Sequence, residues 1–277
     1  DNKKIEVSRQ NDVSYLYGLD TYKYARITFN GIPKKIRVKV SGFTFGDSDW
    51  SISPKRYNIE GKKFGNSLLF DINRLGYVVI KFSQDQDFKK NLVLLVEHPQ
   101  ILPIDYINII EKYKVDNSGK INETFKIQKA LNDISCTEKV LFFPDGIYKT
   151  YMLRFKSNSK IFLSRNARII ADPSSLNTYL ENDSSILNRF LLIEDSENIE
   201  ISGLGILDGN GTQISITSNS KLLKSLDIRL ILINRSKNIK FNGILLKDSA
   251  RWNTHILESD NVSFTNYKLM NNPNENL

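Results

Sequence analysis

The first hundred residues alternate hydrophobic and polar side chains with a period of two. Because successive side chains of a strand point to opposite faces, such runs bury one face and leave Lys and Arg in water. Turn signals separate the runs, among them Asn30-Gly31-Ile32-Pro33. Short strands divided by turns predict a small antiparallel β-sandwich. The predicted strands cover residues 25–29, 35–40, 67–72, 77–82 and 92–96.

A linker and one helix follow the predicted sandwich. Pro99 and Pro103 mark the linker, so we expect a β-sandwich domain over 1–100 and a second domain over 101–277. A helix is predicted from Asn122 to about Ser135, because its apolar residues recur at helical spacing. Those apolar residues are Phe125, Ile127, Ala130, Leu131 and Ile134.

From Lys139 onward, short strands alternate with tight polar turns, and a unit repeats. The unit is Ser-x-Asn-[Ile/Val]-x-[Ile/Phe]-x-[Gly/Asn], aligned on Asn158, Asn198, Asn238 and Asn261. Asn238 and Asn261 lie 23 positions apart, and Asn198 and Asn238 lie 40 apart, so an excursion separates the latter two. A period in the twenties that is built of short strands is typical of a solenoid.

The repeat favours a parallel β-helix. Each coil has an apolar side that it cannot bury alone, whereas stacked coils share one core. The repeated Asn can form a ladder of side-chain hydrogen bonds between coils. A leucine-rich repeat is the rival solenoid, but its Leu-x-x-Leu-x-Leu spacing is missing. The excursions near 174–190 and 212–226 are expected to be loops that shape a binding face.

Several motifs, taken in order, resemble a known family. They are 116–124 with Ile127–Leu131, then Phe143-Pro144-Asp145-Gly146-Ile147-Tyr148, the Gly203–Gly211 segment and the Asp248–His255 segment. Residues 115–277 resemble polygalacturonases, glycoside hydrolase family twenty-eight of the pectin-lyase-like superfamily. The sandwich resembles the N-terminal domain of dextranases and isopullulanases. The resemblance implies a right-handed parallel β-helix, capped by a short α-helix and preceded by the sandwich.

The same resemblance implies inverting hydrolysis of a polysaccharide by two carboxylates, roughly 6.5–9.5 Å apart. In the family these carboxylates follow an Asn-x-Asp motif and lie on later coils. Asn276 is a candidate for the motif Asn, and its Asp would follow Leu277. We therefore expect the N-terminal portion of a secreted, periplasmic or cell-surface hydrolase, inactive alone, with its catalytic residues beyond Leu277.

Five residues are candidates for substrate binding: Arg251, Trp252, His255, Asn272 and Asn276. A Trp offers a flat apolar face to a sugar ring, and a His can donate hydrogen bonds to hydroxyls. Arg251 could pair with a carboxylate of the substrate. The alternatives are that Trp252 packs in the core, that His255 satisfies a local backbone group, and that Arg251 is a solvated surface residue.

Other polar residues have structural interpretations. Asp208, in Asp-Gly-Asn-Gly, is expected in a turn, and Asp248 at the end of a repeat strand. The single cysteine, Cys136, excludes an intrachain disulfide and is expected to be a small buried residue on the helix. Gly203-x-Gly205 lacks the third glycine and the helix of a dinucleotide motif. No loop has the ligand density that calcium requires, so neither a metal nor a cofactor is expected.

The charge and the apolar runs narrow the partners. The net charge of +8 is spread along the chain without a run of five basic residues, so nucleic acid is not expected. A positive protein favours encounter with polyanions, including an acidic polysaccharide. No apolar run approaches the roughly 18–20 residues of a membrane span. A calcium-dependent β-helix lyase and a non-catalytic carbohydrate-binding or adhesin fragment remain alternatives, and the oligomeric state is not indicated.

Overall fold

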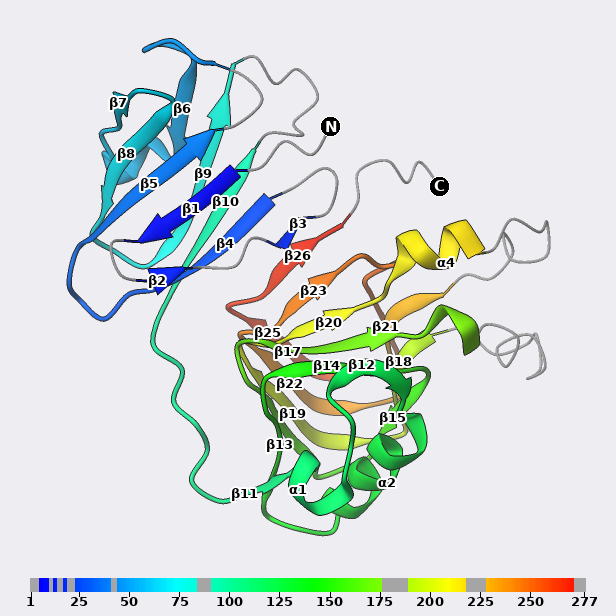
Figure 1. Cartoon of the computed structure of the whole chain (residues 1–277). Helices are drawn as coiled ribbons and strands as arrows, with labels where there is room; N and C mark the ends of the chain where they lie inside the picture. Colours follow the sequence, from blue (N-terminus) through cyan, green and yellow to red (C-terminus); the bar gives the residue numbers. More distant parts are fainter. Residues whose placement is uncertain are drawn as a thin grey trace. The chain divides into compact units, whose positions relative to one another are not determined.

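The computed structural model describes residues 23–40, 44–83, 91–175, 189–217 and 228–271, together with three short strands near the N-terminus. The chain divides into two compact units, one up to Pro99 and one from Gln100 to Asn271 (Figure 1). Among the described residues, no helix has the length and apolar character needed to span a membrane.

The first unit is a sandwich of two five-stranded sheets, ordered β2-β1-β5-β8-β7 and β3-β4-β10-β9-β6. Along β5 the buried positions alternate with lysine and arginine, as the period of two predicts. Buried residues of both sheets form one core, for example Val38, Leu68, Ile80 and Leu94. The strands are β1 Ile5–Arg9, β2 Asp12–Val13, β3 Tyr17–Gly18, β4 Lys23–Thr28, β5 Lys34–Val40, β6 Trp50–Ser53, β7 Lys62–Phe64, β8 Ser67–Ile72, β9 Gly76–Phe82 and β10 Leu92–Glu97.

The predicted sandwich is confirmed, with one parallel pair among its antiparallel ones. β10 lies between β4 and β9 and pairs with β4 in parallel over six residues, from Leu92 with Lys23 to Glu97 with Thr28. A parallel pair requires a long crossover connection, here most of the sandwich sequence, so no local pattern could have revealed it.

The second unit is the predicted right-handed parallel β-helix. Its three sheets are all parallel, and Figure 1 shows their strands stacked coil upon coil. The first helix sheet contains β11 Tyr106–Asn108, β13 Val140–Phe143, β16 Lys160–Leu163, β19 Glu197–Gly203, β22 Lys237–Asn242 and β25 Asp260–Thr265. The second contains β12 Ser118–Asn122, β14 Gly146–Thr150, β17 Ala167–Ala171, β20 Ile206–Asp208, β23 Leu245–Lys247 and β26 Lys268–Met270. The third contains β15 Leu153–Phe155, β18 Arg189–Glu194, β21 Arg229–Asn234 and β24 Thr254–Leu257.

Like residues stack on like residues inside the coils. Ile199 lies beside Ile239 in the next coil, and Ile201 lies beside Phe241. Phe241 then stacks on Phe264, with ring centroids 5.0 Å apart and 15° between the planes. Each buried side chain contributes roughly 1.5–3 kcal/mol relative to exposure. The repeat therefore produces one continuous core, because every coil offers its apolar side to its neighbours.

The repeated asparagines form the predicted ladder. Asn198 Nδ2 donates to Asn158 Oδ1 at 3.1 Å, Asn238 Nδ2 to Asn198 Oδ1 at 2.9 Å, and Asn261 Nδ2 to Asn238 Oδ1 at 2.7 Å. All four residues have positive φ, from 52° to 60°. Asparagine tolerates this left-handed conformation better than most residues do, so it serves the backbone and the ladder together.

Glycine in the repeat allows the coils to approach each other. Gly203 has a φ of +104°, and a Cβ there would stand 2.1 Å from the carbonyl oxygen of Leu163 in the preceding coil. Gly243 has the same relationship to Gly203, with a φ of +84° and a distance of 2.2 Å to its carbonyl oxygen. Both the positive φ and the lack of room for a Cβ atom therefore require glycine at this position of the repeat.

Two helices pack at the first coil. α2, Thr124–Ile134, coincides with the predicted helix and buries Ile127, Ala130, Leu131 and Ile134 against the coil core. The sequence pattern did not predict α1, Ile109–Tyr113, a short helix that is capped by the side chain of Asn108. Phe125, one of the five apolar residues at helical spacing, lies outside the buried stripe and is 84% exposed. The expectation that Cys136 is buried on the helix is wrong, because it lies in the turn after α2 and is exposed to solvent.

The expected excursions are described only in part. In the first, residues 173–175 form a 3-10 turn. In the second, Gly211–Thr217 forms helix α4 rather than a loop, and Ile214 joins the coil core. A seven-residue helix is too short to show a clear apolar period, which explains why the pattern did not reveal it.

Candidate functional site

Three side chains meet on the third helix sheet, near the first residues of β21 and β24. Arg229 Nε donates to Nδ1 of His255 at 2.7 Å. The guanidinium carbon of Arg229 lies 5.1 Å from the centroid of the Trp252 ring, and the Trp252 and His255 rings meet edge to face at 4.8 Å. Each residue thus contacts the other two, and we call this group the Trp252 cluster.

Burial differs sharply within the Trp252 cluster. Arg229 is 4% exposed, whereas Trp252 is 54% exposed. Trp252 is therefore not a core residue: one side of its indole is supported by a buried cation and an imidazole, and the rest faces solvent. A cation beside an aromatic ring stabilises the pair by roughly 0.5–2 kcal/mol, which fixes the ring in one orientation.

The hydrogen bond also sets the state of His255. A guanidinium group can only donate, so Nδ1 must accept and cannot carry a proton. The neutral imidazole then has its proton on Nε2. Arg229 reaches His255 from the preceding coil, an interaction between coils that the sequence did not suggest.

Backbone contacts hold Trp252 in place. Its carbonyl oxygen accepts from Leu230 N at 2.9 Å and from Ser249 Oγ at 3.0 Å. Thr254 Oγ1 and the Tyr267 hydroxyl are 2.9 Å apart, which joins the start of β24 to the turn before β26. The Trp252 cluster therefore stands on ordered coils rather than on a free loop, the arrangement that favours precise ligand contacts.

Of the other three predicted site residues, the structure describes one. Arg251 is half-buried beside Trp252 in sequence. Asn272 and Asn276 lie outside the described residues. Of the five candidates, the structure brings Trp252 and His255 into contact.

Sequence reasoning missed two arginines. Arg189 and Arg229 are 8% and 4% exposed and occupy the same register position on β18 and β21. Their signal was present, since each begins a strand of aliphatic residues and the two are 40 positions apart, the same interval as Asn198 and Asn238.

The buried carboxylates nearby have structural partners. Asp208 is fully buried and forms ion pairs with Arg168 at 2.6 Å and Lys247 at 3.1 Å. Its Oδ1 also accepts from Asn210 N at 2.9 Å, which is the turn interaction expected from the sequence. The cations on both neighbouring coils were not expected, and they explain how a carboxylate is tolerated there.

Asp248 follows β23, as expected, and is bound by α4. Thr212 donates to Asp248 Oδ1 from its hydroxyl at 2.9 Å and from its backbone N at 3.2 Å. Burial raises the pKa of Asp248, the Thr212 hydrogen bonds oppose this shift, and the nearby charge of Asp208 adds to it. A general acid requires a raised pKa, but Thr212 already engages this carboxyl group. Asp208 and Asp248 therefore hold the turns between coils.

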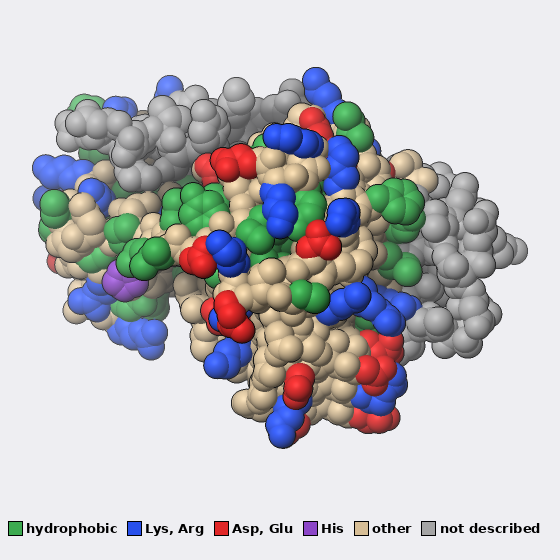
Figure 2. Space-filling model, turned by 90° about the horizontal axis from the view of Figure 1, so that it is seen from below, with side chains coloured by type: hydrophobic (Ala, Val, Ile, Leu, Met, Phe, Trp, Pro, Cys, Tyr) green, Lys and Arg blue, Asp and Glu red, His purple; other side chains and the backbone are tan. Residues whose placement is uncertain are grey.

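In the part of the chain that the structure describes, metal-ligating and charged groups form no further centre. Among the described residues, no three His, Cys, Asp or Glu side chains gather as metal ligands would. On the face seen in Figure 2, Lys and Arg side chains lie among Asp and Glu side chains rather than in a block of one sign. That mixture agrees with the dispersed charge of the sequence.

Comparison with solved structures supports the fold. No family model and no curated protein matches the chain. Dex49A from Penicillium minioluteum aligns with 90% of this chain and 47% of its own length, at 14% identity and a TM-score of 0.57. The family 28 exopolygalacturonase of Yersinia enterocolitica aligns with 93% of this chain and 59% of its own, at 14% identity and a TM-score of 0.50.

The chain thus spans about half the length of these two proteins. At such low identity the likeness is one of fold. The predicted resemblance is confirmed at that level: the second unit has the right-handed parallel β-helix of polygalacturonase-like proteins.

Proposed function

We propose that this chain forms the first coils of a glycoside hydrolase that acts on a polysaccharide, and that the Trp252 cluster binds one sugar unit of that substrate. The exposed Trp252 ring, held by Arg229 and His255, carries this proposal. Sugar rings present apolar C–H faces that stack on indole.

The local charge suggests the substrate class. Arg229 belongs to the Trp252 cluster, Arg189 pairs with it in register on β18, and Arg251 precedes Trp252 in the sequence. Guanidinium groups bind carboxylates in a bidentate geometry. An acidic polysaccharide such as a polyuronate is therefore the substrate class that we propose for this surface.

The cleaving groups belong, in this proposal, to further coils. Among the described residues, β24, β25 and β26 are the last strands of their sheets, and core-facing Ile256 and Leu269 are 43% and 54% exposed. Their counterparts one coil earlier, Ile233 and Leu246, are completely buried. In this proposal, further coils cover these apolar positions. Inverting hydrolysis would then use two carboxylates from those coils.

Product analysis tests the proposal and separates it from its alternatives. A protein in which these coils continue should release new reducing ends from polygalacturonate, and Trp252→Ala should remove most of that activity. The 277-residue chain alone should bind polygalacturonate without cleaving it. A calcium-dependent rise in the absorbance of unsaturated products would instead identify a lyase, and binding without any product from the longer protein would identify a binding or adhesin module.

A further inference from the structure

A polar groove follows the asparagine ladder on the outer side of the first helix sheet. One depression of about 500 Å³ is lined by residues of the turn after α2 together with Asn158, Lys160 and Asn198. A second, of about 320 Å³, includes Lys160, Asn198, Asn238, Lys240 and Asn261. Because both share Lys160 and Asn198, they form one groove that crosses four successive coils.

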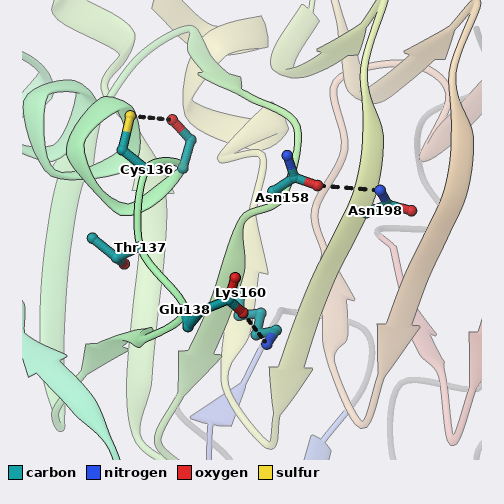
Figure 3. A pocket seen from close by; sticks show the side chains of 7 residues that line it. Cys136, Thr137, Glu138, Asn158, Lys160 and Asn198 are labelled. Atoms are coloured by element: carbon teal, nitrogen blue, oxygen red, sulfur yellow. Dashed lines mark hydrogen bonds and ion pairs between the residues drawn. The ribbon is translucent and has the colours of Figure 1, made fainter.

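The ladder leaves hydrogen-bonding capacity in the groove. Figure 3 shows Asn158 and Asn198 side by side on neighbouring coils, joined by one hydrogen bond. An amide group has two donor hydrogens and two acceptor lone pairs, and each ladder bond uses one donor and one acceptor. Each coil therefore presents one amide N–H and one acceptor lone pair that the ladder does not use. These groups recur from coil to coil at about 4.8 Å, the spacing of hydrogen-bonded strands. That interval is close to the length of one sugar unit in an extended chain.

Charged side chains alternate along the floor of the groove. Lys160, Glu200 and Lys240 occupy one register row on three consecutive coils, and all three are exposed. At one end Glu138 faces Lys160, with 3.6 Å between Nζ and Oε2 (Figure 3). The two lysines and two glutamates that line the groove cancel in charge. Such a row offers both donors and acceptors to hydroxyl groups but gives no net attraction to a polyanion.

We propose that this groove binds an uncharged, extended polysaccharide chain, one sugar unit to a coil, at a site separate from the Trp252 cluster. The Trp252 cluster lies on the third helix sheet and combines an exposed aromatic ring with arginines, whereas the groove on the first helix sheet has polar amides and balanced charges. The two surfaces therefore select different sugars. The groove would anchor the protein to a neutral polymer while the other site engages an acidic one.

Cys136 provides a direct probe of the groove. It is the single cysteine of the chain, it is exposed, and it lines the larger depression. An environment-sensitive fluorophore attached there should respond saturably to at least one of cellohexaose, xylohexaose and isomaltohexaose, and less to hexagalacturonate. Calorimetry on the unlabelled chain with the same sugars provides the second measurement, in case the label obstructs the groove.

The matched variants are Lys240→Ala and Lys237→Ala. Both remove a lysine from β22, but only Lys240 lines the groove. Lys240→Ala should weaken binding of the neutral hexasaccharide at least about fivefold, because it removes a charged hydrogen-bond donor. Lys237→Ala should leave that affinity within about twofold.

Three results would overturn the proposal: no neutral hexasaccharide bound by either measurement, tighter binding of hexagalacturonate in the groove, or equal losses in both lysine variants. None of these depends on whether Trp252 binds an acidic sugar, so the two proposals can fail independently.

Discussion

Arg229 and His255 are joined by a 2.7 Å hydrogen bond from Nε to Nδ1, across neighbouring strands of the third helix sheet. The bond requires an unprotonated Nδ1, since a guanidinium group has no acceptor. Protonation would remove the acceptor and place two positive charges in contact. The support of Trp252 therefore depends on a neutral imidazole.

Removal of the His255 acceptor should consequently disturb the Trp252 cluster. His255→Leu removes the Nδ1 atom that accepts from Arg229 Nε, so the emission of Trp252 should change. The measurement is tryptophan fluorescence in a Trp50→Phe background, since the chain has two tryptophans. His255→Gln, which can still accept a hydrogen bond, is the control and should change the emission less; equal changes in the two variants would contradict the role of His255.

The asparagine ladder should contribute measurably to stability. Asn198→Ala removes two ladder bonds and places alanine at a φ of 59°, so the expected loss is roughly 2 kcal/mol. Asn198→Gly removes only the bonds and should lose about half as much. Asn242→Ala, on an exposed strand position, is the control and should stay within about 0.5 kcal/mol. Urea unfolding measures all three, and equal stabilities would show that the ladder is energetically neutral.

Close coil packing predicts a large effect at Gly203. Gly203→Ala must move backbone, because the new Cβ would meet the Leu163 carbonyl oxygen, and we expect a loss above about 4 kcal/mol. Gly31 has a similar φ of +90° but nothing within 4 Å of its would-be Cβ. Gly31→Ala should therefore lose only roughly 1–2 kcal/mol, the conformational part. Thermal unfolding of both variants checks this, and comparable losses would refute the steric argument.

Asp208 and Asp248 should respond oppositely to neutralisation. Asp208→Asn leaves Arg168 and Lys247 without their partner and should destabilise the protein by roughly 3–5 kcal/mol. Asp248→Asn removes a buried charge, keeps an acceptor for Thr212 and suits a φ of 47°, so stability at pH 7 should be unchanged or higher. Urea midpoints at pH 7 distinguish the two variants.

The pH dependence of stability gives a second test for Asp248. Its pKa is higher in the folded chain than in the unfolded chain, so between these two values the folded chain binds more protons. This carboxyl group therefore lowers stability as the pH rises through that interval and restores it on acidification. In Asp248→Asn this component should be absent; an identical pH profile of the free energy of unfolding would contradict the assignment.

The structural features that were predicted correctly are those that a short stretch of sequence determines. The alternation in β5 and β8, the helical spacing in α2 and the aligned asparagines each indicate their own structure, because period and turn chemistry determine them. The parallel pairing of β4 with β10 and the helix α4 could not be read in this way. The first depends on a distant partner, and the second is too short to show a period.

The candidate site was predictable only in part. Trp252 and His255 lie three positions apart in a recognisable motif, but Arg229 reaches them from a preceding coil. Its contribution becomes visible only when the coil register is known. The same holds for Asp208, whose turn role was evident while its ion pairs with Arg168 and Lys247 were not. Interactions between coils depend on the length of each excursion, which the repeat alone does not fix.

The most direct test of the account is a fluorescence titration of the Trp50→Phe chain with oligogalacturonates, in which Trp252 is the sole reporter. We expect a saturable change in emission, weakened at least about tenfold by Arg229→Gln through loss of a charged hydrogen-bond donor and of the ring's support. Emission that is unaffected by saturating oligogalacturonate, or an affinity that Arg229→Gln leaves unchanged, would contradict the claim that the Trp252 cluster binds an acidic sugar.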